Sequence, residues 1–208
     1  VVFEDGTALV ADAGHLWLSK SNLRTSAFKV RTTKEMYQAK GTFSVPLVSP
    51  LESPSIALPL DPYVLGLWLG DGETNAAGIS VDNHDVQEVL GLVRESVPAA
   101  VLTKTAVERV ARISLRGDSQ GNLYARGGCV RGQLANLGVL GAKHIPAQYL
   151  RASRGQRMEL LRGLMDSDGC LSAGQQQAIF SNSNETLANG VVELVRSLGY
   201  RTRMTTAP

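Results

Sequence analysis

Two short segments with the same pattern constrain the fold of this chain more than any other feature. The upstream segment, residues 64–72, reads VLGLWLGDG, and the downstream segment, residues 160–169, reads LLRGLMDSDG. Aligned on their final Asp-Gly pairs, both carry Gly-Leu, a large apolar residue, a variable residue and a small residue before the Asp. Asp71 and Asp168 lie 97 positions apart. An imperfect repeat at that distance predicts two similar half-domains.

Small residues lie four positions apart in both segments, as Gly66 with Gly70 and as Gly163 with Ser167. Residues four apart share one face of a helix. Small side chains on a shared face let two helix backbones approach closely. The apolar residues around them predict buried helices, and a glycine at the usual C-cap position ends each one. The sequence therefore predicts two helices packed against each other.

The position of the two aspartates at the helix ends predicts an ion-binding site. If the helices lie side by side and parallel, Asp71 and Asp168 meet at the C-terminal ends. Each carboxylate then faces the negative end of a helix dipole and the charge of its neighbour. A divalent cation would offset both effects. One such helix alone would indicate only a buried helix, whereas two matched copies favour a site.

The repeated segments resemble a known signature. LLRGLMDSDG closely resembles the motif of LAGLIDADG homing endonucleases, and VLGLWLGDG resembles a more divergent first copy, with Leu69 in place of the first acid. In that family the second acid of each copy binds the catalytic metal. The resemblance therefore implies Asp71 and Asp168 as catalytic metal ligands for Mg²⁺ or Mn²⁺, helped by carbonyls near Gly70 and Ser167.

A lysine between the two copies adds to the resemblance. Lys143 precedes Ile145-Pro146, as in the block between the two motifs of intein endonucleases. The family places this lysine beside the metal site, where it stabilises charge on the phosphate or positions the attacking water. The family often supplies a second lysine in the later half, but no Lys follows Lys143 here. That position is then empty or filled by Gln or Arg.

The first 50 residues favour β-structure. Asp5-Gly6 between apolar residues is a hairpin signal. The run from Asp12 to His15 is similar to the Thr-x-x-His splicing block of inteins, with Asp12 in place of Thr. The resemblance implies that His15 polarises the amide at the upstream splice junction. Asp12 departs from the family pattern, although an acid at this position could still orient the imidazole. From the residues alone, a histidine at a strand edge is the alternative.

The proline-rich stretch FSVPLVSPLESPSIALPL joins the two regions. Together with the following motif it resembles the junction in inteins of replicative DNA helicases. An intein begins with Cys or Ser and ends with His-Asn, whereas this sequence begins with Val1 and ends with Pro208. We therefore expect that the chain as written is a fragment, or joined pieces, and does not splice by itself.

Charge is distributed unevenly along the sequence. Residues 104–162 hold eleven Lys or Arg against three acids, whereas residues 61–103 hold one Arg against seven acids. A local positive surplus could follow a phosphate backbone or form a solvated face. The candidates for DNA contacts are Arg109, Arg112, Arg116, Arg151, Arg154, Arg157, Gln175 and Gln177.

These features together predict an α+β fold. Residues 1–57 would be a partial β-rich splicing region with a linker, and residues 58–208 an endonuclease with halves of about 58–140 and 141–208. Each half would have the order αββαββα, and the two would form a saddle over DNA. No apolar run reaches the roughly 18 residues of a membrane span, and Cys129 and Cys170 match no zinc spacing.

The predicted function is cutting of double-stranded DNA at one site by an intein of a replicative DNA helicase. The expected partners are duplex DNA and the host's flanking extein sequences, and the protein is expected to be monomeric and cytoplasmic. Two alternatives stay open. One is a degenerate DNA-binding or structural insert in an intein that only splices. The other is an RNA-splicing maturase or transcription regulator of the same fold, against which the splicing-type segment argues.

Overall fold

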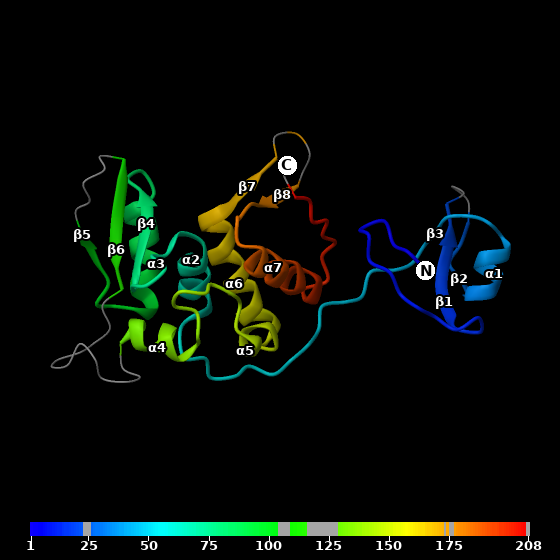
Figure 1. Ribbon diagram of the computed structural model, residues 1–208, viewed down its shortest axis with the longest axis horizontal. Helices are drawn as coiled ribbons and strands as arrows, with labels where there is room; N and C mark the ends of the chain where they lie inside the picture. The colour runs from blue at the N-terminus through cyan, green and yellow to red at the C-terminus, as the bar shows by residue number, and fades with distance from the viewer. Residues whose placement is uncertain (23–25, 104–108, 116–128, 173, 175–176, 207–208) are drawn as a thin grey trace. The chain divides into compact units, whose positions relative to one another are not determined.

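A computed structural model describes all residues except 23–25, 104–108, 116–128, 173, 175–176 and 207–208. The chain forms two compact units, drawn in Figure 1. Unit 1 comprises Val1–Ser49 and Gly199–Pro208, and unit 2 comprises Pro50–Leu198. Helices and small antiparallel sheets occur in both, so the predicted mixture of α and β structure is confirmed. The predicted domain boundary near residue 58 stays a prediction.

Unit 1 contains a small antiparallel sheet in the order β2-β1-β3. Its strands are β1 (Leu16–Ser21), β2 (Lys29–Thr32) and β3 (Phe43–Ser44). Ahead of the sheet, the chain turns at Gly6, whose φ is 84°. Val2 and Ala8 form a bridge across this turn. The turn predicted at Asp5-Gly6 is therefore present.

Unit 1 also contains a helix that the β-rich interpretation missed, α1 (Thr33–Gln38). Its signal is a capping box in the sequence. The backbone N–H of Glu35 donates to Thr32 Oγ1 at 3.1 Å, and the N–H of Thr32 donates to Glu35 Oε2 at 2.7 Å. These bonds satisfy donors at the start of a helix that have no partner within it. The bond from the N–H of Thr32, together with one from its hydroxyl at 3.0 Å, lowers the pKa of Glu35.

The first part of unit 2 packs two helices against a three-stranded sheet of order β4-β6-β5. Its elements are α2 (Pro62–Asp71), β4 (Gly78–Asp82), α3 (Val86–Ser96), β5 (Val101–Thr103), β6 (Val110–Ser114) and α4 (Val130–Asn136). The central strand pairs Ile79 with Ile113, and both side chains are fully buried. Alternate residues of β6 therefore face the core, as a period of two requires.

The second part of unit 2 is mainly helical. Its elements are α5 (Ala147–Leu150), α6 (Arg154–Asp168), the hairpin strands β7 (Gly169–Leu171) and β8 (Ala178–Phe180), and α7 (Glu185–Ser197). The long helix α6 contacts α2, α5 and α7. One apolar core runs through both parts of unit 2.

The segment between residues 50 and 60 lies along unit 2 and forms specific hydrogen bonds with it. The hydroxyl of Tyr149 donates to the carbonyl of Leu60 at 2.7 Å and accepts from its N–H at 3.1 Å. Gln156 makes a similar pair of bonds with the backbone of Ile56. Tyr149 is buried, and the burial of its side chain raises its pKa to about 12. The stretch predicted as a linker is therefore anchored to unit 2.

Both motif helices end at their Asp-Gly pairs, as the sequence predicts. Asp61 caps α2 by accepting from the N–H of Val64 at 3.1 Å. As predicted, Gly72 and Gly169 are the C-cap residues, but both adopt extended backbones, with φ of −74° and −96°, in place of the left-handed conformation that is common for a glycine at a helix end. Their lack of a side chain serves close packing instead. A Cβ on Gly72 would lie 2.2 Å from the carbonyl oxygen of Trp68.

Across the described residues, no helix is long and apolar enough to cross a membrane.

Candidate active site at the ends of the paired helices

The two motif helices pack directly against each other, with their backbones in contact at glycine positions. A Cβ on Gly66 would lie 2.4 Å from the carbonyl oxygen of Leu160, and one on Gly163 would lie 2.1 Å from the carbonyl oxygen of Tyr63. Further along, Gly70 faces Ser167. The contact positions increase together along both helices, so the helices are parallel. Only residues without a Cβ permit this approach at Gly66 and Gly163.

Parallel packing brings the ends of α2 and α6 together. A Cβ on Gly70 would lie 2.0 Å from Ser167 Oγ and 3.3 Å from Asp168 Oδ2. Ser167 turns its hydroxyl toward its own helix and donates to the carbonyl of Leu164 at 2.9 Å. The carboxylate of Asp168 therefore lies beside the last turn of α2, next to Asp71.

The environment of Asp71 disfavours its charge. Surrounding protein atoms raise the pKa of Asp71 by desolvation, and the nearby Asp168 carboxylate raises it further. Lys143 acts in the opposite direction. Two carboxylates held together at helix C-termini are a costly arrangement unless a positive charge joins them.

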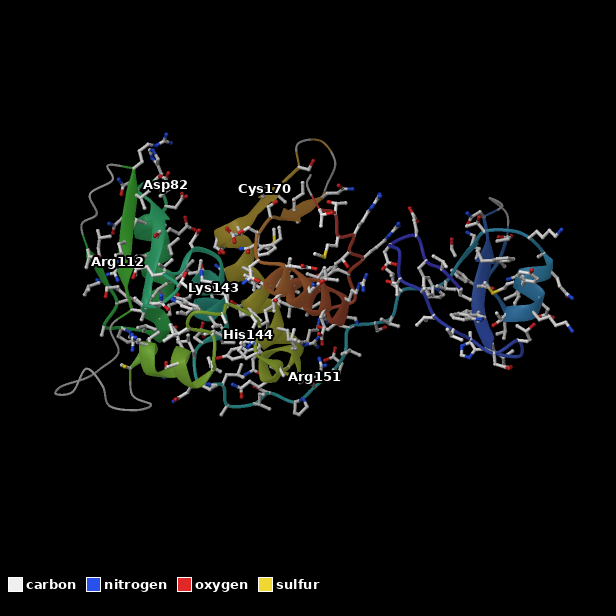
Figure 2. All side chains as sticks on the ribbon, viewed as in Figure 1. Asp82, Arg112, Lys143, His144, Arg151 and Cys170 are labelled. Atoms are coloured by element: carbon white, nitrogen blue, oxygen red, sulfur yellow. The ribbon has the colours of Figure 1, made fainter. Side chains whose placement is uncertain are left out.

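Lys143 supplies a positive charge at this point (Figure 2). Its Nζ donates to the carbonyl of Gly70 at 2.8 Å and lies 5.2 Å from the ring centre of Trp68. Burial lowers the pKa of Lys143, while Asp168 and Asp71 raise it. The lysine from the loop before α5 is therefore placed against the end of α2, in the field of both acids.

Two asparagines that the sequence analysis missed complete the site. Asn182 Nδ2 donates to Asp168 Oδ2 at 2.6 Å, and Asn184 Nδ2 donates to the carbonyl of Lys143 at 2.8 Å. A signal for Asn184 was available, because it is a preferred N-cap residue directly before the amphipathic stretch that forms α7. Nothing in the sequence connects Asn182 with Asp168, which lies 14 positions away.

The acids do not form a larger cluster. Among the described residues there is no group of three or more His, Cys, Asp and Glu that could hold a metal ion. The oxygen donors at the helix ends are thus two carboxylates together with backbone carbonyls such as that of Gly70.

Comparisons with known proteins agree with this geometry. Residues 155–207 match the model of the LAGLIDADG-like domain. The chain is also 36% identical over 236 aligned residues to a replicative DNA helicase DnaB of Mycobacterium intracellulare. That alignment covers 99% of this chain and 35% of the helicase, so the chain spans about a third of its relative.

This chain therefore contains a LAGLIDADG-like domain, at residues 155–207. The two comparisons confirm the resemblance that its repeated segments predict. The domain match covers α6, the β7–β8 hairpin and α7. It thus contains Asp168, Asn182 and Asn184, whereas Asp71 and Lys143 lie outside the matched range.

The basic residues predicted to contact DNA differ from one another in their surroundings. Arg112 lies on the sheet and Arg151 at the end of α5, as Figure 2 shows. Arg112 forms a two-pronged ion pair with Glu73, in which Nη2 donates to Oε2 at 2.8 Å. Arg151 pairs with Glu193 at 2.7 Å. To bind a phosphate, each arginine would have to leave its glutamate or contact both groups at once.

Arg157 contradicts its predicted role as a phosphate contact, since the residue is only 1% exposed. Its guanidinium donates to the carbonyls of Ala152 at 3.1 Å and Ser197 at 2.7 Å, and also to that of Leu51. Burial lowers its pKa. The three-residue spacing with Arg154 does not reveal this, because α6 turns Arg157 inward toward α7. Arg157 is a structural residue that connects the first and last residues of unit 2, through the carbonyls of Leu51 and Ser197.

The remaining candidates stay predictions. Arg109, Arg154 and Gln177 are exposed. Arg116 and Gln175 lie outside the described residues.

In unit 1, Asp12 and His15 lie in one tight turn. Asp12 Oδ1 accepts from the N–H of Gly14 at 2.7 Å, and the N–H of His15 donates to the carbonyl of Asp12 at 3.1 Å. The imidazole packs edge-on against Trp17, with 4.7 Å between ring centres. Asp12 therefore shapes the turn that presents His15.

Proposed function

We propose that this chain is the endonuclease region of an intein of a replicative DNA helicase and that it cuts double-stranded DNA at one site. The observation that carries the proposal is the meeting of Asp71, Asp168 and Lys143 at the ends of two parallel helices. A carboxylate pair with an adjacent cation suits hydrolysis of phosphodiesters. The helicase similarity over 99% of the chain supports the host.

The residues at the helix ends fit Mg²⁺ or Mn²⁺. Carboxylate and carbonyl oxygens are the ligands that these hard cations prefer. Desolvation and the second acid raise the pKa of Asp71, and a bound cation would relieve both effects. Asp71 and Asp168 would hold the cation, with help from the carbonyls of Gly70 and Ser167. When bound, it supplies an activated water and offsets charge on the leaving oxygen.

The chain's own residues prepare the site for phosphate. Asp71 and Asp168 would fix the position of the cation between the helix ends, and through it that of the scissile phosphate. Lys143 already directs its Nζ to the last turn of α2. Because an ammonium carries three donors, it can keep the Gly70 carbonyl and also donate to a phosphate oxygen. It would thereby stabilise the charge that develops there.

The remainder of unit 2 would bind the duplex. We propose that α2 and α6 each begin one half of a pseudo-symmetric saddle, with the sheets β4-β6-β5 and β7-β8 facing the DNA. Exposed basic residues such as Arg109 and Arg154 would contact phosphates and set the register, while polar side chains such as Gln177 would contact base edges. Unit 1 would be part of the splicing region, with His15 acting on the upstream junction.

The test is incubation of the chain with Mg²⁺ and a plasmid that carries the uninterrupted helicase gene. We expect one linear product, and no product when EDTA removes the metal. Asp168→Asn should keep DNA binding and lower cleavage by more than about 100-fold, since even supporting residues of metal sites contribute 10- to 100-fold. Cleavage by Asp168→Asn at the wild-type rate would refute the proposal.

A second candidate is a degenerate insert that binds DNA without cutting it. It is favoured by the lack of any Lys after Lys143, which leaves this chain without the later lysine that the resemblance predicts. Retained binding to the helicase gene with no nick or cut at any Mg²⁺ concentration would support this alternative.

A further inference from the structure

The loop between β8 and α7 holds Asp168 at two points. The side-chain amide of Asn182 donates to Asp168 Oδ2 at 2.6 Å. The backbone N–H of Ser181 donates to the main-chain carbonyl of Asp168 at 3.2 Å. The carboxylate and the backbone of this acid are therefore fixed by the same loop.

The next residues of the loop connect this acid with the lysine. Asn182 Oδ1 accepts from the N–H of Asn184 at 2.8 Å. Asn184 Oδ1 accepts from the N–H of Leu187 at 3.2 Å, which caps α7, and Asn184 Nδ2 donates to the carbonyl of Lys143 at 2.8 Å. A continuous chain of hydrogen bonds thus runs from the carboxylate of Asp168 to the backbone of Lys143.

The acid of the first motif lacks an equivalent. Among the residues that the structure describes, none donates a hydrogen bond to the carboxylate of Asp71. The two acids would bind the same kind of cation, but only Asp168 is oriented beforehand.

We propose that Asn182 is a positioning residue for Asp168 and that Asn184 is a positioning residue for Lys143. The inference rests on the proposed function and extends it to a loop with no role in the motif. The bond from Asn182 to Oδ2 limits rotation of the carboxylate, and the lone pairs that it leaves unused would bind the cation. Partners of this kind contribute about 10- to 100-fold to metal affinity or activity.

Serine substitutions separate these roles from simple folding. Asn182→Ser keeps a short acceptor for the N–H of Asn184 but removes the amide that reaches Asp168. Asn184→Ser keeps a good N-cap for α7 and removes the donor to Lys143. Asn189→Ser, at an exposed position of α7, is the matched control. The binding of Mn²⁺ is measured by calorimetry without DNA, and thermal unfolding is recorded for each variant.

We expect Asn182→Ser to weaken Mn²⁺ binding about tenfold or more, with a thermal midpoint close to that of Asn189→Ser. Asn184→Ser should leave Mn²⁺ affinity within about twofold and slow plasmid cleavage about tenfold, since it acts through Lys143. Wild-type Mn²⁺ affinity in Asn182→Ser would overturn its role, and wild-type cleavage by Asn184→Ser would overturn the other.

A measurement on the wild-type protein covers the case in which a loop variant fails to fold. Mn²⁺ should broaden the NMR signals of the Asn182 side-chain amide together with the Asp168 backbone. Broadening at Asp168 without broadening at Asn182 would refute the inference alone. A wild-type protein that neither binds Mn²⁺ nor cuts DNA would refute the proposed function, and the inference with it.

Discussion

The two motif helices share a sequence pattern and pack against each other, but they differ in how deeply they are buried and in the partners of their side chains. In α2, every residue from Tyr63 to Leu69 is buried. The longer α6 buries only Arg157, Leu160, Gly163 and Leu164. Its more exposed side carries Arg162 and Asp166, with 3.8 Å between Arg162 Nε and Asp166 Oδ2. The hydroxyl of Tyr63, in α2, donates to the same carboxylate oxygen at 3.0 Å. The repeat thus specifies the contact between the helices and the acids at their ends.

The difference extends to the acids. Asp71 is the last residue of a largely buried helix, and among the described residues no side chain donates a hydrogen bond to its carboxylate. Asp168 is the last residue of a more exposed helix, and its carboxylate accepts from the amide of Asn182. Two copies of one motif can therefore hold equivalent ligands with unequal support.

The largest expected effect concerns the shared contact. In Gly163→Ala, the new Cβ would lie 2.1 Å from the carbonyl oxygen of Tyr63 and 2.9 Å from the N–H nitrogen of Leu67. Both atoms belong to backbone, so the helices must separate. We expect the free energy of unfolding to fall by about 3 kcal/mol or more, measured by urea denaturation.

The same substitution elsewhere in α6 is the control. Gly155 lies in the first turn, and a Cβ there would meet no atom closer than Ser153 Oγ at 4.0 Å. Gly155→Ala should leave stability unchanged or raise it by up to about 1 kcal/mol through helix propensity. Equal effects at Gly163 and Gly155 would show that the helices do not pack as described.

The next effect concerns the side of α6 that has no counterpart in α2. Arg157→Met removes hydrogen bonds to the buried carbonyls of Ala152 and Ser197 and to that of Leu51. Unsatisfied buried groups are costly, so the free energy of unfolding should fall by about 2 kcal/mol. Arg151→Met breaks only an exposed ion pair with Glu193 and should cost less than about 1 kcal/mol. If both variants bind DNA equally weakly at unchanged stability, Arg157 is a phosphate contact after all.

The smallest expected effect separates the two acids. Because the folded protein raises the pKa of Asp71, the charged carboxylate opposes folding once the pH exceeds its value in the unfolded chain. Without metal, Asp71→Asn should therefore stabilise the protein at pH 7, by less than about 1 kcal/mol given its exposure. The gain should vanish as the pH falls below about 4, the pKa of an unfolded aspartate.

The matched variant Asp168→Asn loses the charged acceptor for Asn182, so we expect no gain in stability from it. Thermal unfolding of both variants between pH 4 and pH 8 without metal provides the test. An equal gain in both would show that the amide of Asn182 does not distinguish the two acids.

Several features could be predicted from local sequence. The cap at Asp61, the apolar periodicity of α3 and α7, and the turn at Gly6 depend on neighbours along the chain. The helix α1 was also predictable from its capping box, but the β-rich composition around it obscured that signal. The extended backbones of Gly72 and Gly169 were not predictable, because packing against Trp68 and Met165 selects glycine there.

By itself, the sequence determined that two helices would pack at Gly66 and Gly163 and that their ends would carry two acids. Repeated small residues record a requirement for close approach, which any pairing of the helices must satisfy. The burial of Arg157 and the amide of Asn182 on Asp168 were decided only by the tertiary structure. Such contacts join residues that are distant in the chain, and their energy depends on directions that spacing alone does not define.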